Sequence, residues 1–502
     1  MQLLLGIDVG TQGTKAVLYR ADGRWVADAF IKSRPRHPAP GALEEDPEDQ
    51  LGAALGTIRE CLAKSGTDAG DIAGLAIAGQ MAGVIGIDDT GRAVTPYDSW
   101  LDTRCSAYIE RMRTDDDLVL RRTGNVPSFN HGPKILWWKH ERPAAYDRIA
   151  RFVQPGAYVA MRLCGLDATA AFIDPTYLHF SGLADNAASR WDDELCARFA
   201  VAPGKLPQIV PSTHVVGHVS AEMAAACGLR AGTPVIAGCG DTAASFLACG
   251  ATEPGICIDV AGTASVFAAT TDRFIPDTQK GILGCGRSVF AGLWHPYAYI
   301  NGGGQNLEWF RHAIAERASL ADLDAAAADG TLDNRLPYFV PHLGGRVSPA
   351  WPQLRGGWVN LDWSATPATL FRALLEGVAL EYTLYRDAVS ALCPGFTVRE
   401  IRITGGGEKS ATWNQLKANR LQARVLGIER GGGAPLGAAM LAGAGIGVLP
   451  DLHHATRQWI STGVACEPDR STAELGRVRT QRYAALLDAL QAWTVGQGVC
   501  PP

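Results

Sequence analysis

Residues Gly6–Tyr19 read GIDVGTQGTKAVLY, and a similar stretch, CIDVAGTASVFAAT, occupies Cys257–Thr270. Each stretch joins an Ile-Asp-Val run to a turn containing Gly and Thr, and then to a second apolar run. Because apolar residues alternate with others before the turn, each stretch predicts a β-hairpin. The two copies stand half of the 502-residue chain apart. The repeat therefore predicts two similar sheets, one in each half of the chain.

The segments between and after the two hairpins alternate in character. Residues 47–66 have the pattern of a helix, whereas 72–80, 233–241 and 399–404 have the pattern of buried strands. A last amphipathic helix is expected over 472–493. Such alternation of strands and helices is typical of an α/β protein.

The chain length favours two domains, because 502 residues exceed what one hydrophobic core usually serves. We place the junction near 247–254, just before the second hairpin. The predicted domains are an N-terminal one over 1–247 and a C-terminal one over 248–502.

Composition and charge exclude some classes of binding partner for this protein. The net charge of −5 gives no basic surface for nucleic acid or anionic membrane, so small-molecule partners are expected. The 12 cysteines form no C-x-x-C pair, which argues against a zinc site or a disulfide framework and favours a reducing cytoplasm. No segment has the pattern of a signal peptide or of a membrane span.

The turn of the first hairpin has the composition of a phosphate-binding loop. Gly-rich turns expose backbone N–H groups to phosphate oxygens, Thr hydroxyls add donors, and an adjacent carboxylate can hold Mg²⁺. The residues that supply these parts are Asp8, Gly10, Thr11, Gln12, Gly13 and Lys15. A purely structural hairpin, in which Asp8 bonds its own turn, is the alternative. The second copy, with Asp259, Gly262 and Thr263, favours phosphate binding.

A third glycine-rich segment, GGGEKS, follows the expected strand 399–404. It is a near miss for the dinucleotide fingerprint of nicotinamide-dependent dehydrogenases, whose last position is Gly or Ala. Beside the two hairpins it makes more sense as a backbone ledge for adenosine. Ser410 is expected to cap the helix that follows.

Motifs along nearly the whole chain resemble those of the FGGY family of carbohydrate kinases, and most of all its xylulokinase members. In family order they are GIDVGTQGTK, GLAIAGQMAG, SWLDTR, PKILWW, AGCGDTAAS, DVAGTASVFAAT, LLEGVALE, TGGGEKSATWNQ and APLGAAMLAG. The resemblance implies two actin-like domains of the ribonuclease H fold, with a cleft between them for ATP and a sugar. It also allows a homodimer.

The same resemblance implies roles for the residues that bind ATP and Mg²⁺. Asp8 would serve the metal. The phosphates and the nucleotide would contact Thr11, Gln12, Gly13 and Lys15, the second loop at Gly262 and Thr263, the adenosine loop at Gly406 and Gly407, and, by a looser match, Gly304 and Glu308.

By the same resemblance, Asp241 would be the general base that accepts a proton from the sugar hydroxyl. Its structural alternative is the N-cap of a helix beginning at Thr242. The implied sugar contacts are Gln80, Met81, Trp100, Asp102, Phe129 and Thr242. For the two aromatic residues a core position is the alternative, and for Asp102 an ion pair with Arg104 at the surface.

Three positions depart from the xylulokinase pattern. Ala82 stands where a His is usual, Thr242 where an Asn follows the base, and His131 where a small residue precedes PKILWW. The missing imidazole removes a hydrogen-bonding group from the sugar site and so argues against D-xylulose as the acceptor. The family resemblance implies a ketose such as a pentulose, or another ketose or polyol. An actin-like filament or chaperone ATPase is the rival from another class, and sugar-dependent release of ADP separates the two.

Overall fold

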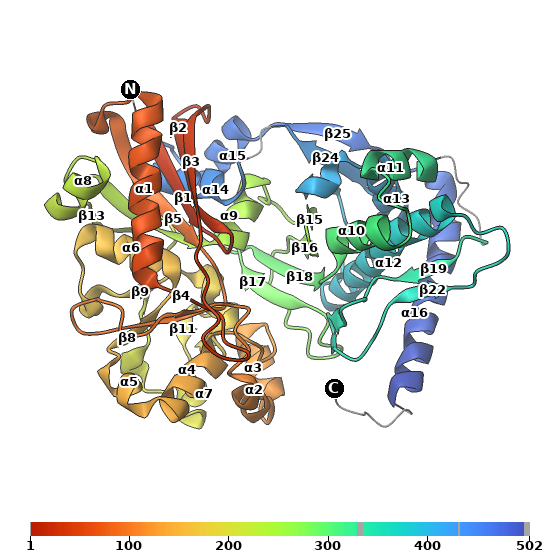
Figure 1. Cartoon of the computed structure of the whole chain (residues 1–502), viewed down its shortest axis with the longest axis horizontal. Helices are drawn as coiled ribbons and strands as arrows, with labels where there is room; N and C mark the ends of the chain where they lie inside the picture. The colour runs from red at the N-terminus through yellow and green to blue at the C-terminus, as the bar shows by residue number, and fades with distance from the viewer. Residues whose placement is uncertain (1, 329–334, 430–431, 496–502) are drawn as a thin grey trace. The chain divides into compact units, whose positions relative to one another are not determined.

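The structure is a computed structural model that describes residues 2–328, 335–429 and 432–495 (Figure 1). These residues form two compact units. Unit 1 contains 2–252, 285–293 and 432–461, and unit 2 contains the remainder. The chain thus first leaves unit 1 after Thr252 and later returns to it twice. The functional division expected between residues 247 and 248 stays a prediction.

A six-stranded sheet forms the centre of unit 1. Its strands, in order, are β13 (Val215–His218), β14 (Pro234–Gly240), β5 (Ile72–Gly79), β1 (Leu3–Val9), β2 (Gly13–Arg20) and β3 (Trp25–Lys32). The first three strands of the sequence form an antiparallel meander, and β5 and β14 extend it in parallel with β1. The predicted hairpin over Gly6–Tyr19 is β1 and β2.

Both faces of this sheet are covered, because β1 is apolar at successive positions. Leu3 and Ile7 pack in a core with α1 (Pro47–Ser65) and α6 (Pro155–Cys164). Leu4 belongs to a second core with α9 (Asp241–Ala248) and α14 (Gly433–Gly445). A strand buried on both faces is what a central position in a covered sheet requires.

Glycines bring α14 into close contact with β1 and α9. A Cβ at Gly6 of β1 would lie 1.8 Å from the carbonyl oxygen of Pro435, and one at Gly437 would lie 2.1 Å from that of Ala244 in α9. No side chain fits at such distances, so the helix and its neighbours meet backbone to backbone. The APLGAAMLAG motif therefore supplies a helix of small residues that completes unit 1.

The remaining elements of unit 1 lie mostly between β5 and β13 in the sequence. They are β4 (Glu44–Glu45), β6 (Ile85–Ile87), β7 (Tyr97–Asp98), α2 (Ser106–Arg113), α3 (Asp116–Thr123), α4 (His131–Glu141), α5 (Pro143–Arg148), β8 (Arg151–Val153), β9 (Phe172–Ile173), β10 (Ala184–Asp185), β11 (Arg190–Trp191), α7 (Asp193–Arg198), β12 (Gln208–Ile209), α8 (Ala221–Cys227) and α15 (Leu452–Trp459). Short 3₁₀ turns join several of them, among them η3 (Pro175–Phe180).

Unit 2 repeats the strand arrangement of unit 1. Its sheet includes, in order, β18 (Trp294–Ile300), β16 (Ser265–Ala269), β15 (Ile256–Ala261), β23 (Glu400–Thr404), β24 (Arg424–Ile428) and β25 (Thr462–Cys466). The strands run in the same relative directions as β3, β2, β1, β5, β14 and β13. The second predicted hairpin is β15 and β16, and the predicted duplication is present.

The helices of unit 2 pack around α12 (Pro367–Leu392), which contacts both α13 (Ala411–Leu421) and α16 (Ala473–Val495). Buried charges join these helices, since Glu376 of α12 bonds Arg420 of α13 and Arg479 of α16. The other elements are α10 (Gly303–Ala313), α11 (Leu320–Ala328), β19 (Tyr338–Val340), β20 (Arg346–Val347), β21 (Ala350–Trp351) and β22 (Gly357–Val359). β17 (Gly284–Arg287) begins in unit 2 and continues into the segment 285–293 of unit 1.

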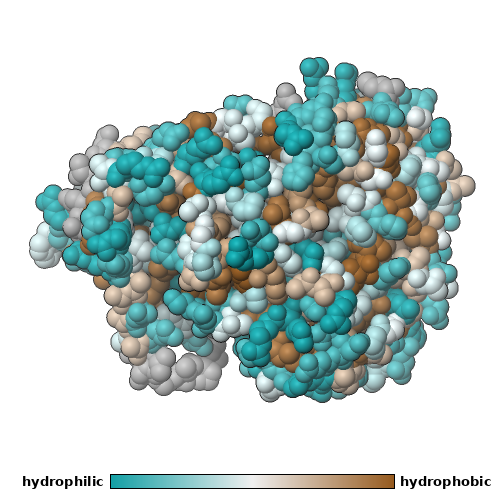
Figure 2. Space-filling view, turned by 180° about the vertical axis from the view of Figure 1, so that it is seen from behind, coloured by the Kyte–Doolittle hydropathy of each residue, from teal (hydrophilic) through white to brown (hydrophobic). Residues whose placement is uncertain are grey.

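The surface seen in Figure 2 mixes hydrophilic and hydrophobic residues over the whole face. Among the residues that the structure describes, no helix is both long enough and apolar enough to cross a membrane.

Candidate active site

Three adjacent parallel strands of unit 1 end at the same level. Val9 of β1 pairs with Gly79 of β5, which in turn pairs with Gly240 of β14. Because carboxyl ends of parallel strands meet at one edge, the residues around these ends share a small region. The register therefore brings together Asp8 and the two residues that follow the other strands, Gln80 and Asp241.

The charge of Asp241 affects the ionisation of Asp8. Burial and the nearby charge of Asp241 raise the pKa of Asp8 to about 8, against a lowering effect of Lys15. Burial also raises the pKa of Asp241 to about 6. The Oδ1 atom of Asp8 is buried and has no hydrogen-bond partner within residues 2–328, 335–429 and 432–495. Asp8 and Asp241 therefore form an acidic pair. Such a pair is suited to binding a cation and to transferring a proton.

The backbone around Asp241 does not match the N-cap alternative. Asp241 is the first residue of α9, and the capping position belongs to Gly240. Its Oδ1 accepts hydrogen bonds from the N–H and the hydroxyl of Thr242, at 2.6 and 3.2 Å. An N-cap side chain instead bonds N–H groups two or three positions further along. The carboxylate keeps Oδ2 for other partners.

The first hairpin turn is closed by two backbone hydrogen bonds, Gly10 N–H to Gly13 O at 3.1 Å and Gly13 N–H to Gly10 O at 3.2 Å. The hydroxyl of Thr11 donates to Gln80 Oε1 at 3.2 Å and accepts from the Trp100 indole N–H at 2.9 Å. Lys15 faces Asp8 across the two strands. The structure thus joins the predicted phosphate turn to two of the predicted sugar contacts through one hydroxyl.

Sequence reasoning did not identify Glu45. Its carboxylate accepts hydrogen bonds from Gln80 Nε2 at 3.0 Å and Gln50 Nε2 at 3.1 Å, and burial raises its pKa. Gln80 is fully buried, so these bonds fix its amide. No motif in the run LEEDPEDQ marks Glu45, because its partner Gln80 lies 35 residues further along the chain.

The other predicted sugar contacts differ in their exposure and in whether their polar atoms already have partners. Asp102 is buried and accepts hydrogen bonds from the Leu43 N–H and from Arg104 Nε, each at 2.9 Å. Its ion pair with Arg104 is therefore an interior one and not a surface pair. Trp100 is 45% exposed, and Thr242 is exposed as well.

Met81 and Phe129 lie against apolar cores of unit 1. Met81 is buried in a cluster with Ile173, Tyr177 and Leu178. Phe129 is half-buried against the cluster around α4. The sugar-binding roles of these residues stay predictions.

In unit 2 the second hairpin turn contacts the start of α10. The Gly262 N–H donates to Ala264 O at 3.0 Å and closes the turn. The N–H groups of Gly304 and Gln305 donate to Gly262 O at 2.9 Å and Thr263 O at 3.1 Å. A Cβ at Gly304 would lie 2.5 Å from Gly262 O, so only glycine allows this approach. Glu308, one turn along, binds Arg311 at 2.7 Å.

The segment after β23 also contacts the second hairpin. Gly405 has φ +93°, and a Cβ there would lie 2.8 Å from Ala261 O. One at Gly407 would lie 2.4 Å from the Ala261 Cβ, whereas Gly406 faces open space. Ser410 caps α13 as predicted, through a bond from the Trp413 N–H at 3.1 Å. Three glycine-containing segments of unit 2 thus meet at one strand end.

Asp259 corresponds in the hairpin to Asp8 but has other partners. It is fully buried; Oδ1 accepts a hydrogen bond from the Tyr382 hydroxyl at 2.7 Å, and Oδ2 forms an ion pair with Lys417. The Lys417 ammonium lies 3.7 Å from the ring centre of Trp413. Both oxygens of Asp259 are therefore engaged, which leaves none for a metal.

Comparison with known proteins agrees with the duplicated fold and the two glycine-rich hairpins. Residues 3–248 match the N-terminal domain of the FGGY family of carbohydrate kinases, and residues 259–446 match its C-terminal domain. The chain belongs to this family. As an FGGY carbohydrate kinase, it is a phosphotransferase with an alcohol group as acceptor.

Relatives of this FGGY kinase are similar over almost their full length. It is 26% identical to a xylulose kinase of Bacillus subtilis over 97% of this chain and 96% of that protein. It is 30% identical to a glycerol kinase of Leptothrix cholodnii, over 91% and 94%. The crystal structure of a xylulose kinase from Rhodospirillum rubrum superimposes with a TM-score of 0.89 at 28% identity, over 98% and 99%. The predicted family and fold class are confirmed.

In the FGGY kinase, the position of the missing His is structurally unusual. Ala82 has φ +63°, in the left-handed region that residues other than Gly rarely adopt. The next residue, Gly83, has no room for a side chain, because a Cβ would lie 2.2 Å from the Tyr97 ring. The turn after Gln80 and Met81 is therefore tight, and it presents a methyl group where an imidazole is usual.

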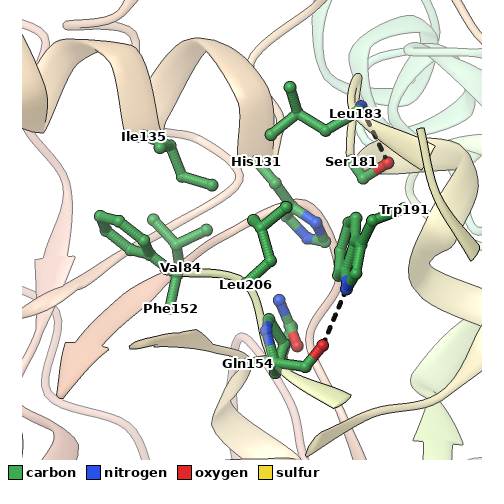
Figure 3. A pocket seen from close by; sticks show the side chains of 10 residues that line it. Val84, His131, Ile135, Phe152, Gln154, Ser181, Leu183, Trp191 and Leu206 are labelled. Carbon is green, nitrogen blue, oxygen red and sulfur yellow. Dashed lines mark hydrogen bonds between the residues drawn. The ribbon is translucent and has the colours of Figure 1, made fainter. Parts of the chain in front are cut away.

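His131, the other departure, lies in the interior of the kinase. It contributes to the wall of a cavity of about 10 Å³, which has room for about one water molecule (Figure 3). Burial lowers the pKa of His131 to about 3, so its ring is neutral. The cavity is also lined by Gln154, Trp191 and Leu206. His131 is thus an interior, neutral residue beside this small cavity.

Proposed function

We propose that this FGGY kinase transfers the γ-phosphoryl group of ATP to a hydroxyl of a ketose or polyol, with Asp241 as general base. The observation that supports it is the pair of carboxylates at the ends of β1 and β14, the two strands that flank β5: Asp8 and Asp241, each with a raised pKa. Perturbed carboxylates in one region are the usual sign of acid–base or metal chemistry.

Asp241 has the properties that the reaction asks of a base. Phosphoryl transfer passes through a loose transition state, so positioning and charge stabilisation dominate, and one carboxylate accepts the proton of the attacking hydroxyl. With a pKa of about 6, Asp241 is mostly ionised at neutral pH. Its Oδ1 is held by Thr242, which leaves Oδ2 for the acceptor hydroxyl.

Asp8 suits a divalent cation. Its buried Oδ1 has no partner among the described residues, and carboxylate oxygens are preferred ligands of Mg²⁺. A cation beside it would favour the ionised carboxylate against the effect of burial. Mg²⁺, when bound, neutralises charge on the phosphates of the nucleotide. Lys15, which faces Asp8, would add positive charge on the same side.

We assign the nucleotide to the glycine-containing turns. In unit 1 the backbone and side chains of Thr11, Gln12 and Gly13 would contact phosphates. In unit 2 the turn at Gly262 and Thr263 lies against Gly304, and Gly407 lies against the preceding residue, Ala261. The backbone N–H groups of such glycine-containing turns suit phosphate oxygens and the adenosine. Gly406 faces open space and leaves room for the nucleoside. Glu308, bound to Arg311, is exposed and could contact the nucleotide by exchanging this partner.

For the acceptor we propose a neutral ketose, with a polyol as the second candidate. The half-exposed Trp100 offers an apolar face to C–H groups, while Asp241 and Thr242 offer polar atoms. Gln80 and Asp102 already have protein partners, so they would shape the site more than bind hydroxyls. The relatives named for xylulose and for glycerol bracket this range.

A screen of ADP release across ketoses, polyols, aldoses and sugar acids tests the proposal. We expect ATP turnover to depend on Mg²⁺ and to rise at least tenfold with one group of ketoses or polyols. ATP turnover that is the same with and without every acceptor would instead favour the actin-like ATPase alternative. Turnover only with sugar acids would overturn the neutral acceptor and leave the kinase assignment intact.

A further inference from the structure

We propose that Thr176 and Tyr177 are positioning residues for Asp241, because they fix the end of β14 from which it emerges. The inference rests on the proposed role of Asp241 as general base. Both residues lie in η3, a 3₁₀ turn that no sequence motif singled out, and both are buried.

The end of β14 needs an external support because its ladder with β5 is irregular. Ile236 pairs with Ala76 and Cys239 with Ala78, so three steps along β14 oppose two along β5. Gly238 lies in this bulge with φ +70°, and a Cβ there would lie 1.9 Å from Ile77 O. A bulge bends its strand and changes the direction of the side chains that follow. Here the side chain that follows is Asp241.

Thr176 holds the last residue of the strand. Its Oγ1 accepts a hydrogen bond from the Gly240 N–H at 3.0 Å. The same hydroxyl donates to Asp174 Oδ1, and Ser212 donates to Asp174 Oδ2. Because the hydroxyl proton points to Asp174, the lone pairs of Thr176 Oγ1 are directed to other donors. The peptide bond immediately before Asp241 is thereby fixed.

Tyr177 joins the ends of two strands. Its hydroxyl donates to Gly79 O at 3.0 Å and lies 3.3 Å from Cys239 O. Gly79 precedes Gln80, and Cys239 stands two residues before Asp241. A Cβ at Gly79 would lie 2.7 Å from the Gly156 N, so glycine at this position allows the close approach of α6 to the end of β5. One side chain thus sets the spacing between the base and the residue that bonds the first phosphate turn.

The bonds that Thr176 and Tyr177 form with β14 and β5 end on peptide units close to Asp241 and Gln80. A displacement of about 1 Å of a reacting group can lower turnover by about 10²-fold. Loss of these bonds is therefore expected to act on the chemical step, with little effect on nucleotide binding.

The test is a pair of matched variants at Thr176. Thr176→Val has nearly the same shape but lacks the hydroxyl, whereas Thr176→Ser keeps it. We expect Thr176→Val to lower kcat by about 10-fold or more with the KM for ATP within about twofold. Thr176→Ser should stay within about threefold of the natural enzyme. Equal losses in both variants would overturn the proposal. Tyr177→Phe, which keeps the ring but lacks the hydroxyl, provides a second test if Thr176→Val does not fold. We expect Tyr177→Phe to lower kcat several-fold, and an unchanged kcat in this variant would also overturn the proposal.

A double-mutant cycle separates this inference from the proposed function. If Thr176 acts through Asp241, adding Thr176→Val to Asp241→Asn should cause no further loss in single-turnover rate. A full additional loss would show that Thr176 acts in another way. Wild-type turnover in Asp241→Asn would overturn the general-base assignment itself, whatever Thr176 does. The melting temperature of each variant shows that it is folded.

Discussion

Asp8 and Asp259 occupy the same place in two hairpins of the same sheet topology, yet they have opposite environments. Asp8 keeps a buried oxygen without a partner among the described residues, whereas both oxygens of Asp259 are bonded, by Tyr382 and Lys417. A repeated motif therefore preserves the strand geometry and not the chemistry of each residue. The unpaired carboxylate is the one suited to function.

The same contrast extends beyond the hairpins. In unit 1, burial raises the pKa of Asp8 to about 8, of Asp174 to about 7 and of Asp241 to about 6. In unit 2, arginine partners hold the pKa of Glu376 below its usual value in spite of burial, and Arg346 and His342 lower that of Glu381 to about 2. Among the described residues, none of these three carboxylates of unit 1 forms an ion pair, whereas Glu376 of unit 2 uses its ion pairs to hold helices together.

The largest effect is expected at Asp241. Asp241→Asn removes the proton acceptor and should lower kcat by about 10²- to 10⁴-fold, the usual contribution of a general base. Steady-state ADP release with the best acceptor measures it, and equilibrium ATP binding should persist. Asp22→Asn, at an exposed turn of the same unit, is the matched control. An Asp241→Asn enzyme with most of its turnover would remove Asp241 from the mechanism.

At Asp259 the effect should appear in stability. Asp259→Asn leaves the fully buried Lys417 without its counter-charge, and breaking such a pair costs about 3–5 kcal/mol. Urea unfolding measures the free energy. Asp259→Leu combined with Lys417→Met should recover most of the loss, because apolar residues can replace a buried pair. If the single variant unfolded like the natural protein, the pair would have no structural role.

Asp8→Asn should show the reverse of Asp259→Asn. We expect turnover to fall by about 10²-fold and the Mg²⁺ concentration for half-maximal rate to rise, because the substitution replaces a carboxylate ligand of the metal with a neutral amide. The free energy of unfolding should stay equal or increase, since a buried carboxylate with a raised pKa is removed. An unchanged Mg²⁺ requirement would contradict the assignment of Asp8.

A smaller effect is expected in the pH dependence of stability. Glu381 has a pKa of about 2 in the folded protein, below its ordinary value of 4.5, so its contribution is present above pH 4.5. It is lost as the pH falls toward 2, by at most about 1.4 kcal/mol per pH unit. Urea unfolding between pH 5 and about pH 3 should show a shallower slope in Glu381→Gln than in the natural protein. Equal slopes would mean that Glu381 has no lowered pKa.

Local patterns were enough to predict the parts of the fold that depend on local physics. The alternation in the two Ile-Asp-Val runs predicted both hairpins, and the Ser after the GGGEK segment predicted the cap of α13. The family resemblance added the grouping of Asp8, Gln80 and Asp241. Strand register places these three residues at one edge of the sheet, while their roles in the site stay predictions.

Long-range pairings explain what the sequence did not predict. Lys417 is 158 residues from Asp259, and no local pattern indicates that a helix from that distance neutralises the second hairpin. Glu45 and Thr176 act through partners 35 and 64 residues away. The sequence also did not predict the bulge in β14, because one extra residue does not change the apolar pattern of the run PVIAGCG.

The close contact of α14 with β1 has a consequence for protein synthesis. Gly6 lies 429 residues before its neighbour Pro435 and is therefore translated much earlier. One face of the nascent sheet of unit 1 stays uncovered until α14 has been translated. A truncated fragment that stops at residue 252 would expose that face to water, and we expect it to aggregate unless a segment containing α14 is supplied in trans.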